Sequence, residues 1–240
     1  MRVSTWWRML CLAIVATLVT SGCSFPGMTG NSNLPETRVL FIGNSMTFYN
    51  IGVDQVVHGL APRTTVELQA VSGATLTDHL ANTTTMDRVR QGHWTYVVIQ
   101  EQSQYPVIFY GTYLASLRKL VAEVRAAGAT PLLMMTWARP DDPRVSTASI
   151  RTAVRAAGKE VKAAVIPAGV AFGASQASHN GISLATHDGH PTPEGTYLAG
   201  CVVYAAIFGE SPEGNTFLGG VDAGFAKVLQ ATAEKAVRGT

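Results

Sequence analysis

The sequence predicts an α/β protein, a three-layer α/β/α sandwich around a central, mainly parallel five-stranded sheet. Two patterns predict this class. Five short, nearly continuous apolar runs are typical of strands buried on both faces, and segments with helical periodicity alternate with the later runs. The composition agrees, because 47% of the 240 residues are hydrophobic and 14% are charged. These values exclude a disordered chain and a long charged coiled coil.

The strands follow one another at intervals that leave room for crossover helices. Each is rich in Val, Ile, Leu or Met, and several end at a glycine or a polar residue. The predicted strands are 38–43, 66–73, 96–100, 131–136 and 164–169.

Four helices are predicted from apolar spacing and from capping residues. The segment 112–127 has apolar residues at a spacing close to 3.6, and a glycine at 128 ends it. A second helix covers 146–162. Thr192 is the expected N-cap of a third helix that runs to about 208, with proline in its first position. The last helix covers roughly 223–237.

The first 22 residues are interpreted as a signal peptide. Arg2 and Arg8 flank a Trp-Trp pair, and an apolar run follows over residues 9–20. That run has signal-peptide length and is too short to span a bilayer as a helix. The small residues before Cys23 resemble a bacterial lipobox, which would make Cys23 a lipidation site; the alternative is an ordinary secretory signal. Both predict an extracytoplasmic protein, either secreted or a cell-envelope lipoprotein.

Residues 23–36 are rich in Gly, Ser, Asn and Pro and predict a flexible tether. Residues 37–240 are expected to form a single domain, whose one cysteine, Cys201, is expected to be a buried thiol. The chain has 18 Lys and Arg against 16 Asp and Glu, and Arg2 and Arg8 belong to the signal segment. The rest is therefore neutral, which argues against nucleic acid as a partner. Contact with a membrane is expected only through the N-terminal lipid.

Polar residues follow the strands at the edge where parallel sheets bind ligands. Ser45 follows the first strand at a strand-to-helix turn, where a hydroxyl is exposed beside the positive end of a helix. That placement suits a nucleophile, although a helix N-cap serine has the same pattern. Gly73 follows the second strand and can offer a backbone N–H or simply form a turn.

The third strand ends in an unusual polar run, residues 100–104, with the sequence Gln-Glu-Gln-Ser-Gln. A buried amide must find partners. A glutamine N–H here can be an oxyanion donor, or the run can cap the loop that follows. After the fourth strand, Trp137 and Arg139 suit a sugar or carboxylate substrate at the rim of a site, with packing as the alternative for the tryptophan.

Before the third helix, Asp188 and His190 can provide an orienting carboxylate and a general base. A zinc site that also uses His187 is the alternative, but no HExxH motif accompanies these residues, and no metal or other cofactor is predicted. The other histidines have no motif around them and are expected to be ordinary: His58, His79, His93 and His179.

Taken together, these blocks resemble the SGNH (GDSL-type) serine hydrolase superfamily over residues 37–212. Gly43-Asn44-Ser45 resembles the first block, Gly73 the second-block glycine, and Asp188-Gly-His190-Pro the last block. The resemblance is to an uncharacterised bacterial branch with Gln-Glu-Gln-Ser as its third block. It implies a flavodoxin-like fold and a catalytic Ser45, His190 and Asp188. It also implies an oxyanion hole from the N–H groups of Ser45 and Gly73 with Gln102, or alternatively Gln100.

Two departures bear on these roles. The third block usually supplies an asparagine, so Gln100, Gln102 and Gln104 compete for its place, and Gln102 is favoured. The last block usually has Asp-x-x-His, whereas Asp188 stands only two residues before His190. Either the loop is one residue shorter, or the carboxylate is aimed away from the ring and a backbone carbonyl orients a Ser-His dyad.

The resemblance implies a serine esterase that removes a small acyl group, such as acetyl, from a carbohydrate or another ester. The alternative is a non-catalytic, glycan-binding envelope lipoprotein that keeps the fold. The unusual third and last blocks are the features that favour this alternative.

Overall fold

The computed structural model of the protein describes residues 36–178 and 181–239. The predicted signal peptide, Cys23, His179 and all of the tether except Glu36 lie outside the described residues. Within the described part, residue 36 onward belongs to one compact unit.

The sheet has the predicted five strands, and every neighbouring pair is parallel. Their order is β2-β1-β3-β4-β5, which is the flavodoxin-like order of doubly wound sheets. The strands are β1 (Arg38–Gly43), β2 (Thr65–Ala70), β3 (Tyr96–Ile99), β4 (Thr130–Met134) and β5 (Ala164–Ile166). The predicted fold class is therefore confirmed.

The four predicted helices are present, with ends within two residues of those expected. They are α6 (Tyr110–Ala126), α7 (Thr147–Val161), α9 (Pro193–Phe208) and α10 (Ala223–Arg238). As expected, Thr192 caps α9 by accepting a hydrogen bond from the N–H of Gly195. Six further helices in the described part were not predicted. They are α1 (Ser45–Phe48), α2 (Val53–Leu60), α3 (Leu76–Ala81), α4 (Thr83–Gln91), α5 (Tyr105–Ile108) and α8 (Ala168–Ala177).

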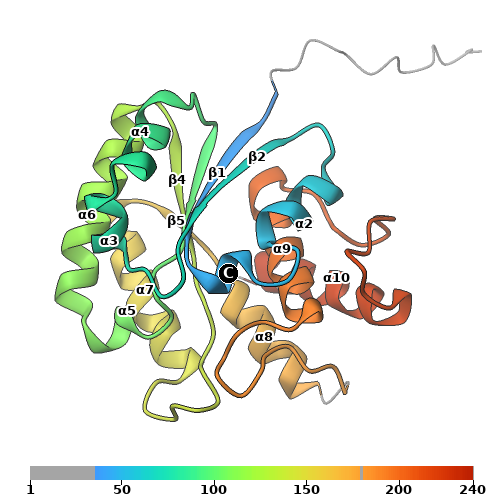
Figure 1. The fold of residues 1–240 in the computed structure, drawn as a ribbon. Helices are drawn as coiled ribbons and strands as arrows, with labels where there is room; N and C mark the ends of the chain where they lie inside the picture. Colours follow the sequence, from blue (N-terminus) through green and yellow to red (C-terminus); the bar gives the residue numbers. More distant parts are fainter. Residues whose placement is uncertain (1–35, 179–180, 240) are drawn as a thin grey trace, which may run out of the picture. The chain divides into compact units, whose positions relative to one another are not determined.

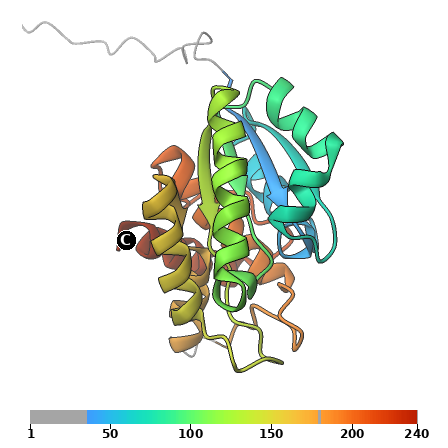
Figure 2. The same cartoon turned by 90° about the vertical axis from the view of Figure 1, so that its left-hand side faces the viewer.

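Helices cover both faces of the sheet and make two separate cores (Figures 1 and 2). Successive side chains of β1 point to opposite faces, as expected for a strand. Val39 and Phe41 pack in the core that α2, α8, α9 and α10 cover. Leu40 and Ile42 pack in the core that α3, α4, α6 and α7 cover. Cys201 is fully buried in α9, as predicted.

Two strands end three residues earlier than predicted, because the chain turns there. The strand expected over 66–73 ends at Ala70, and the N–H of Ala74 then bonds to the Val71 carbonyl in a turn. The strand expected over 164–169 ends at Ile166. Pro167 has no N–H to continue the ladder and becomes the N-cap of α8.

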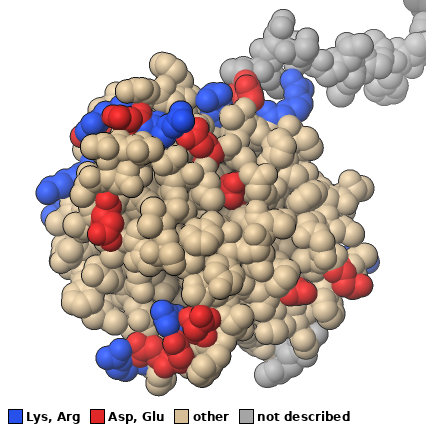
Figure 3. Space-filling model, viewed as in Figure 1, with Lys and Arg blue, Asp and Glu red and all other residues tan. Residues whose placement is uncertain are grey.

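The face seen in Figure 3 has cations beside acids at its top and bottom edges and few charged side chains across its middle. None of the described helices is long and apolar enough to cross a lipid bilayer.

Candidate active site

The candidate site lies where the strand order reverses. β2 and β3 flank β1 on opposite sides, so the loops that follow these three strands diverge from a common edge. Such a switch point is where open α/β sheets bind ligands. The predicted site residues Ser45, Gly73 and Gln102 follow β1, β2 and β3 respectively.

Ser45 is the first residue of α1, directly after the β1 strand, and is 7% exposed. Asn44 caps this short helix, because its Oδ1 accepts a hydrogen bond from the Met46 N–H. The Asn44 Nδ2 donates to the Ala74 carbonyl at 3.0 Å. The N-cap is therefore Asn44, and Ser45 is free of the capping role that was its alternative.

Gln100 secures the same turn and is not placed as an oxyanion donor. Its Oε1 accepts from the Asn44 N–H and from the Thr47 hydroxyl, both at 2.9 Å. Its Nε2 donates to the Glu101 carbonyl. Both ends of the amide are therefore used inside the protein, at 1% exposure.

His190 contacts both of its expected partners. Its Nε2 lies 2.8 Å from the Ser45 Oγ, and its Nδ1 lies 2.8 Å from the Asp188 Oδ2. With Nδ1–H donating to the carboxylate, Nε2 is left to accept the serine proton. The short spacing between Asp188 and His190 therefore does not aim the carboxylate away from the ring.

A tight hairpin explains how two residues can replace three. Thr186 and His190 are bonded across it, with the Thr186 N–H donating to the His190 carbonyl at 2.8 Å. Gly189 at the turn has φ of +85°, a conformation that other residues rarely adopt. The Thr186 hydroxyl donates a hydrogen bond to Asp188. This bond has the largest effect in holding the pKa of Asp188 below its usual value, and the bond from His190 has the next largest.

Three side chains from elsewhere in the chain fix the hairpin in place. The Tyr49 ring stacks on the His190 ring, with centroids 4.3 Å apart. Asn50 donates to the Pro191 carbonyl, and Trp137 donates from its Nε1 to the Gly189 carbonyl, both at 3.0 Å. The site thus depends on Tyr49 and Asn50, which the sequence analysis missed because no sequence signal pairs them with residues about 140 positions away.

Trp137 and Arg139 do not form the expected substrate rim. Trp137 is 2% exposed and stacks on Phe172, so the packing alternative is the one observed. Arg139 is paired with Asp141 through two hydrogen bonds.

The loop that carries Gly73 is tied to the serine turn at both ends. The Val71 N–H donates to the Gly43 carbonyl, and Asn44 bonds to Ala74. Gly73 has φ of +69°, and the space where a Cβ would stand is open. Within residues 36–178 and 181–239, no acceptor pairs with the N–H of Gly73 or with that of Ser45, so both remain available as donors.

Gln102 differs from Gln100 in having a usable amide nitrogen. Its Oε1 accepts from the N–H groups of Gln104 and Tyr105, which fixes the side chain. Among the described residues, its Nε2 has no hydrogen-bond acceptor. The Nε2 of Gln104 is buried and likewise has no hydrogen-bond acceptor among the described residues. The geometry therefore argues against Gln100 as the oxyanion donor and leaves Gln102 and Gln104.

A buried carboxylate joins the loops that bear Gln102 and Gly73. Glu101 is 6% exposed, and its Oε1 accepts from the Gln102 N–H at 2.7 Å and from the Leu76 N–H at 3.2 Å. Burial raises the pKa of Glu101 to about 7. The two hydrogen bonds lower this pKa, but their effect is smaller than that of burial, and the negative charge of Asp78 raises it further. The acid was noted in the sequence only as part of a polar run.

We expect this carboxyl to make stability fall as the pH rises. The folded state binds the Glu101 proton more tightly than the unfolded state, so its contribution is complete below about 4.5 and is lost up to about 7. The loss is about 3 kcal/mol, because each pKa unit corresponds to about 1.4 kcal/mol. Urea unfolding across this pH range should show that the free energy of unfolding falls with rising pH more steeply in the native protein than in Glu101→Gln. The exposed variant Glu213→Gln is the control, and parallel profiles for the native protein and Glu101→Gln would refute the assignment.

One histidine that was expected to be ordinary supports the serine turn. His79 is 1% exposed, and its Nε2 lies 2.7 Å from the Gly43 carbonyl, two residues before Ser45. Because a carbonyl only accepts, this nitrogen carries the proton, and Nδ1 accepts from Thr85. Burial lowers the pKa of His79, which keeps the ring neutral in this role.

No family model matches this chain, and no curated protein matches its sequence. Solved structures do match. A protein described as an SGNH hydrolase from Slackia heliotrinireducens is 27% identical, with a TM-score of 0.63, over 71% of this chain and 98% of its own.

Two further structures show the same fold. A DUF4886 family protein from Bacteroides uniformis is 21% identical, with a TM-score of 0.69, over 84% of this chain and 95% of its own. Axe2, an acetylxylan esterase from Geobacillus stearothermophilus, is 19% identical, with a TM-score of 0.52. The match covers 70% of this chain and 90% of Axe2. The resemblance to the SGNH superfamily is thus confirmed, and it indicates a carboxylic ester hydrolase.

Proposed function

We propose that this SGNH hydrolase is a serine esterase in which Ser45, His190 and Asp188 form the catalytic triad. The observation that carries the proposal is the continuous chain of hydrogen bonds from the Ser45 Oγ through the His190 ring to the Asp188 carboxylate, each 2.8 Å long. Nucleophile and base are within proton-transfer distance without further movement.

The reaction follows from this arrangement in two halves. His190 Nε2 takes the proton as the Ser45 Oγ attacks the ester carbonyl, and the imidazolium is stabilised by Asp188. His190 then gives the proton to the departing alcohol, which leaves an acyl group on Ser45. A water molecule that is deprotonated by His190 attacks this acyl-enzyme and releases the acid.

The oxyanion of each tetrahedral intermediate needs donors aimed at one point. We assign these to the backbone N–H groups of Ser45 and Gly73 and to the Gln102 Nε2. All three follow neighbouring strands, and the first two have no competing acceptor in the described part of the chain. Fixed donors of this kind stabilise the charge that develops in the transition state.

Removing the side-chain donor should slow the chemical step. We expect Gln102→Ala to lower kcat by about 100-fold with little change in KM, since one oxyanion donor contributes about that factor. Gln102→Glu keeps the oxygen that accepts from Gln104 and Tyr105 but lacks the N–H₂ group, so it separates donation from loop capping. Steady-state kinetics of both variants on an acetyl ester are the measurement. An unchanged kcat in both would remove Gln102 from the oxyanion hole.

The proposed substrate is a small acyl ester, such as an acetyl group on a carbohydrate. Axe2 is described as an acetylxylan and acetyl-xylooligosaccharide esterase, and that similarity supports an acylated carbohydrate. The test is turnover of a chromogenic acetyl ester by the purified protein. Saturable turnover that Ser45→Ala loses supports the esterase. Glycan binding without turnover in a folded protein would favour the non-catalytic alternative.

The proposed location is outside the cytoplasm, with Cys23 as the lipidated N-terminus. The short apolar run over residues 9–20 and the small residues before Cys23 support this. In a bacterium that lipidates such signals, the protein should partition with membranes, and Cys23→Ala should lose the lipid. Mass spectrometry that finds an unmodified N-terminus at another residue would replace lipidation with simple secretion.

A further inference from the structure

The carboxylate of Glu101 connects the two loops that bear Gly73 and Gln102, two of the proposed oxyanion donors. Its Oε1 accepts hydrogen bonds from the Gln102 N–H at 2.7 Å and from the Leu76 N–H at 3.2 Å. Leu76 stands three residues after Gly73 and is the first residue of α3. In the described part of the chain, no hydrogen bond other than those of this carboxylate joins the loop after β2 to the loop after β3.

The position of both loops therefore depends on Glu101. The loop with Gly73 is held to the serine turn by the Asn44 side chain. The carbonyl of Gln102 accepts from the Tyr105 N–H, and the bond from its own N–H to Glu101 fixes the peptide on the other side. A shift of either loop would move a donor away from the oxyanion, and a misplacement of about 1 Å can cost about 100-fold in rate.

Glu101 is an acid at a place where a neutral amide can accept the same bonds. Its side chain is 6% exposed, and among the described residues no cation forms an ion pair with it. Burial of an unpaired charge is unfavourable. Hydrogen bonds to an ionised acceptor, however, are shorter and stronger than those to a neutral one. The charge therefore gains a firmer hold on the two N–H groups than a simple cap of α3 needs.

We propose that Glu101 is a positioning residue for the oxyanion hole, whose ionised carboxylate holds the N–H groups of Leu76 and Gln102 and, through them, the two donor loops. This inference rests on the proposed esterase function. In the described part of the chain, Glu101 makes no hydrogen bond to Ser45 or His190. It acts on the placement of the donors, so its loss should lower kcat and leave KM nearly unchanged.

The pH dependence of catalysis distinguishes the charge of Glu101 from its shape. Its pKa is about 7, and α3 and α6 bring Asp78 and Tyr113 near it. Hydrogen bonds from Thr75 lower the pKa of Asp78, and burial raises the pKa of Tyr113. His79, also on α3, stays neutral because burial lowers its pKa. Between about pH 5.5 and about pH 8.5, the carboxyl of Glu101 is therefore the group of this set that changes its charge.

Glu101→Gln keeps an oxygen acceptor but removes the charge. At about pH 8.5 its kcat on a chromogenic acetyl ester should be about tenfold below that of the native protein, with KM within about twofold. At about pH 5.5 the native carboxyl is neutral too, so the two kcat values should agree within about twofold, which also verifies that the variant is folded. Ionisation of His190 affects both proteins and cancels in the ratio. A ratio that is equal at both pH values, or a loss confined to KM, would overturn the inference.

A second measurement tests whether Glu101 acts through the donors. In a Gln102→Ala background one donor is already absent, so adding Glu101→Gln at about pH 8.5 should lower kcat by no more than about threefold. An undiminished tenfold loss in this background would contradict a positioning role.

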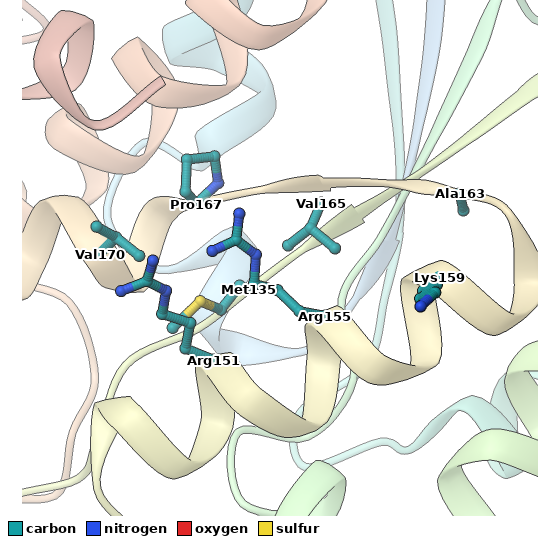
Figure 4. Close-up of a pocket in the computed structure, with 8 residues that line it drawn as sticks. All are labelled: Met135, Arg151, Arg155, Lys159, Ala163, Val165, Pro167 and Val170. Atoms are coloured by element: carbon teal, nitrogen blue, oxygen red, sulfur yellow. The ribbon is translucent and has the colours of Figure 1, made fainter. Parts of the chain in front are cut away.

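Two control variants remove a charge without touching the donor loops. Asp54→Asn removes another buried carboxylate, which accepts from Gln55 of the same helix, α2. Lys159→Gln removes an exposed charge from the last turn of α7, where it lines a cavity beside β5 (Figure 4). Both should keep kcat within about twofold of the native value at both pH values. A pH-dependent loss in either control equal to that of Glu101→Gln would show a general effect of charge and overturn the inference.

The same assays distinguish failure of this inference from failure of the proposed function. A native protein without turnover would overturn the esterase function and the role of Glu101 with it. Native turnover that Ser45→Ala abolishes, together with an unchanged kcat in Glu101→Gln at about pH 8.5, would overturn the role of Glu101 alone.

Discussion

Replacement of His190 by alanine is expected to lower kcat for an acetyl ester by at least about four orders of magnitude, as far as Ser45→Ala does. The reason is that the Ser45 hydroxyl is a weak nucleophile until a base removes its proton, and the His190 Nε2 is the base in contact with it at 2.8 Å. Because the two residues act as a unit, the double variant should be no slower than either single one. Steady-state kinetics of the three variants at one pH test this.

The matched control is His187→Ala, three residues away in the same hairpin. The His187 backbone carbonyl accepts from the Asp141 N–H, and this bond survives the substitution because it uses no side-chain atom. His187→Ala should therefore keep native turnover. Activity that survives in His190→Ala but disappears in His187→Ala would move the general base to His187.

Asp188→Asn is expected to lower kcat by about 100- to 1000-fold, less than loss of the base or the nucleophile. A buried triad aspartate is worth about 10⁴-fold, because asparagine can favour the wrong tautomer of the imidazole. The Asp188 side chain is 55% exposed, so water competes for its bond to the His190 Nδ1 and weakens its effect. The stacked Tyr49 ring and the bonded hairpin continue to hold His190 beside Ser45.

The test is to compare kcat of Asp188→Asn with kcat of Ser45→Ala under the same conditions. The control is Asp141→Asn, which removes a nearby carboxylate that pairs with Arg139 and has no contact with His190. It should leave turnover unchanged. If folded Asp188→Asn is as inactive as Ser45→Ala, Asp188 is a full member of the triad despite its exposure.

Much of this architecture could be predicted from local patterns. The five apolar runs and the capping of α9 by Thr192 depend on neighbours in the sequence, and the structure confirms both. The short helix α4 could not be predicted in this way, because its segment is polar and lacks a clear apolar stripe. Its stability depends on tertiary packing, to which Met86 and Val89 contribute buried side chains.

In the candidate site too, some features follow from neighbouring residues and others depend on contacts between distant ones. The order of the blocks places Ser45 and His190 at one edge of the sheet, which local reasoning can anticipate. The choice between Gln100 and Gln102 depends on what each amide meets in space. Gln100 continues the β3 ladder through its N–H to the Ile42 carbonyl, so its side chain is enclosed at the serine turn. Gln102 stands two residues later, and its Nε2 has no such partner among the described residues.

The geometry of the last block could not be judged from residue counting either. A spacing of two residues is compatible with a triad only if the chain reverses direction between Asp188 and His190. Gly189 makes this reversal through its positive φ, and the bond from the Trp137 Nε1 to its carbonyl secures it. The signal was present as a glycine between the two residues, but its meaning depends on a tryptophan about fifty positions away.

The central claim is that Ser45 is a nucleophile activated by His190, and covalent labelling tests it most directly. A fluorophosphonate probe forms a stable bond to an activated serine and mimics the tetrahedral intermediate. The account predicts one adduct per chain, located by peptide mass spectrometry on Ser45, absent in Ser45→Ala and strongly slowed in His190→Ala. An adduct on a different residue, or a native protein that turns over an acetyl ester while Ser45 remains unlabelled, would contradict it.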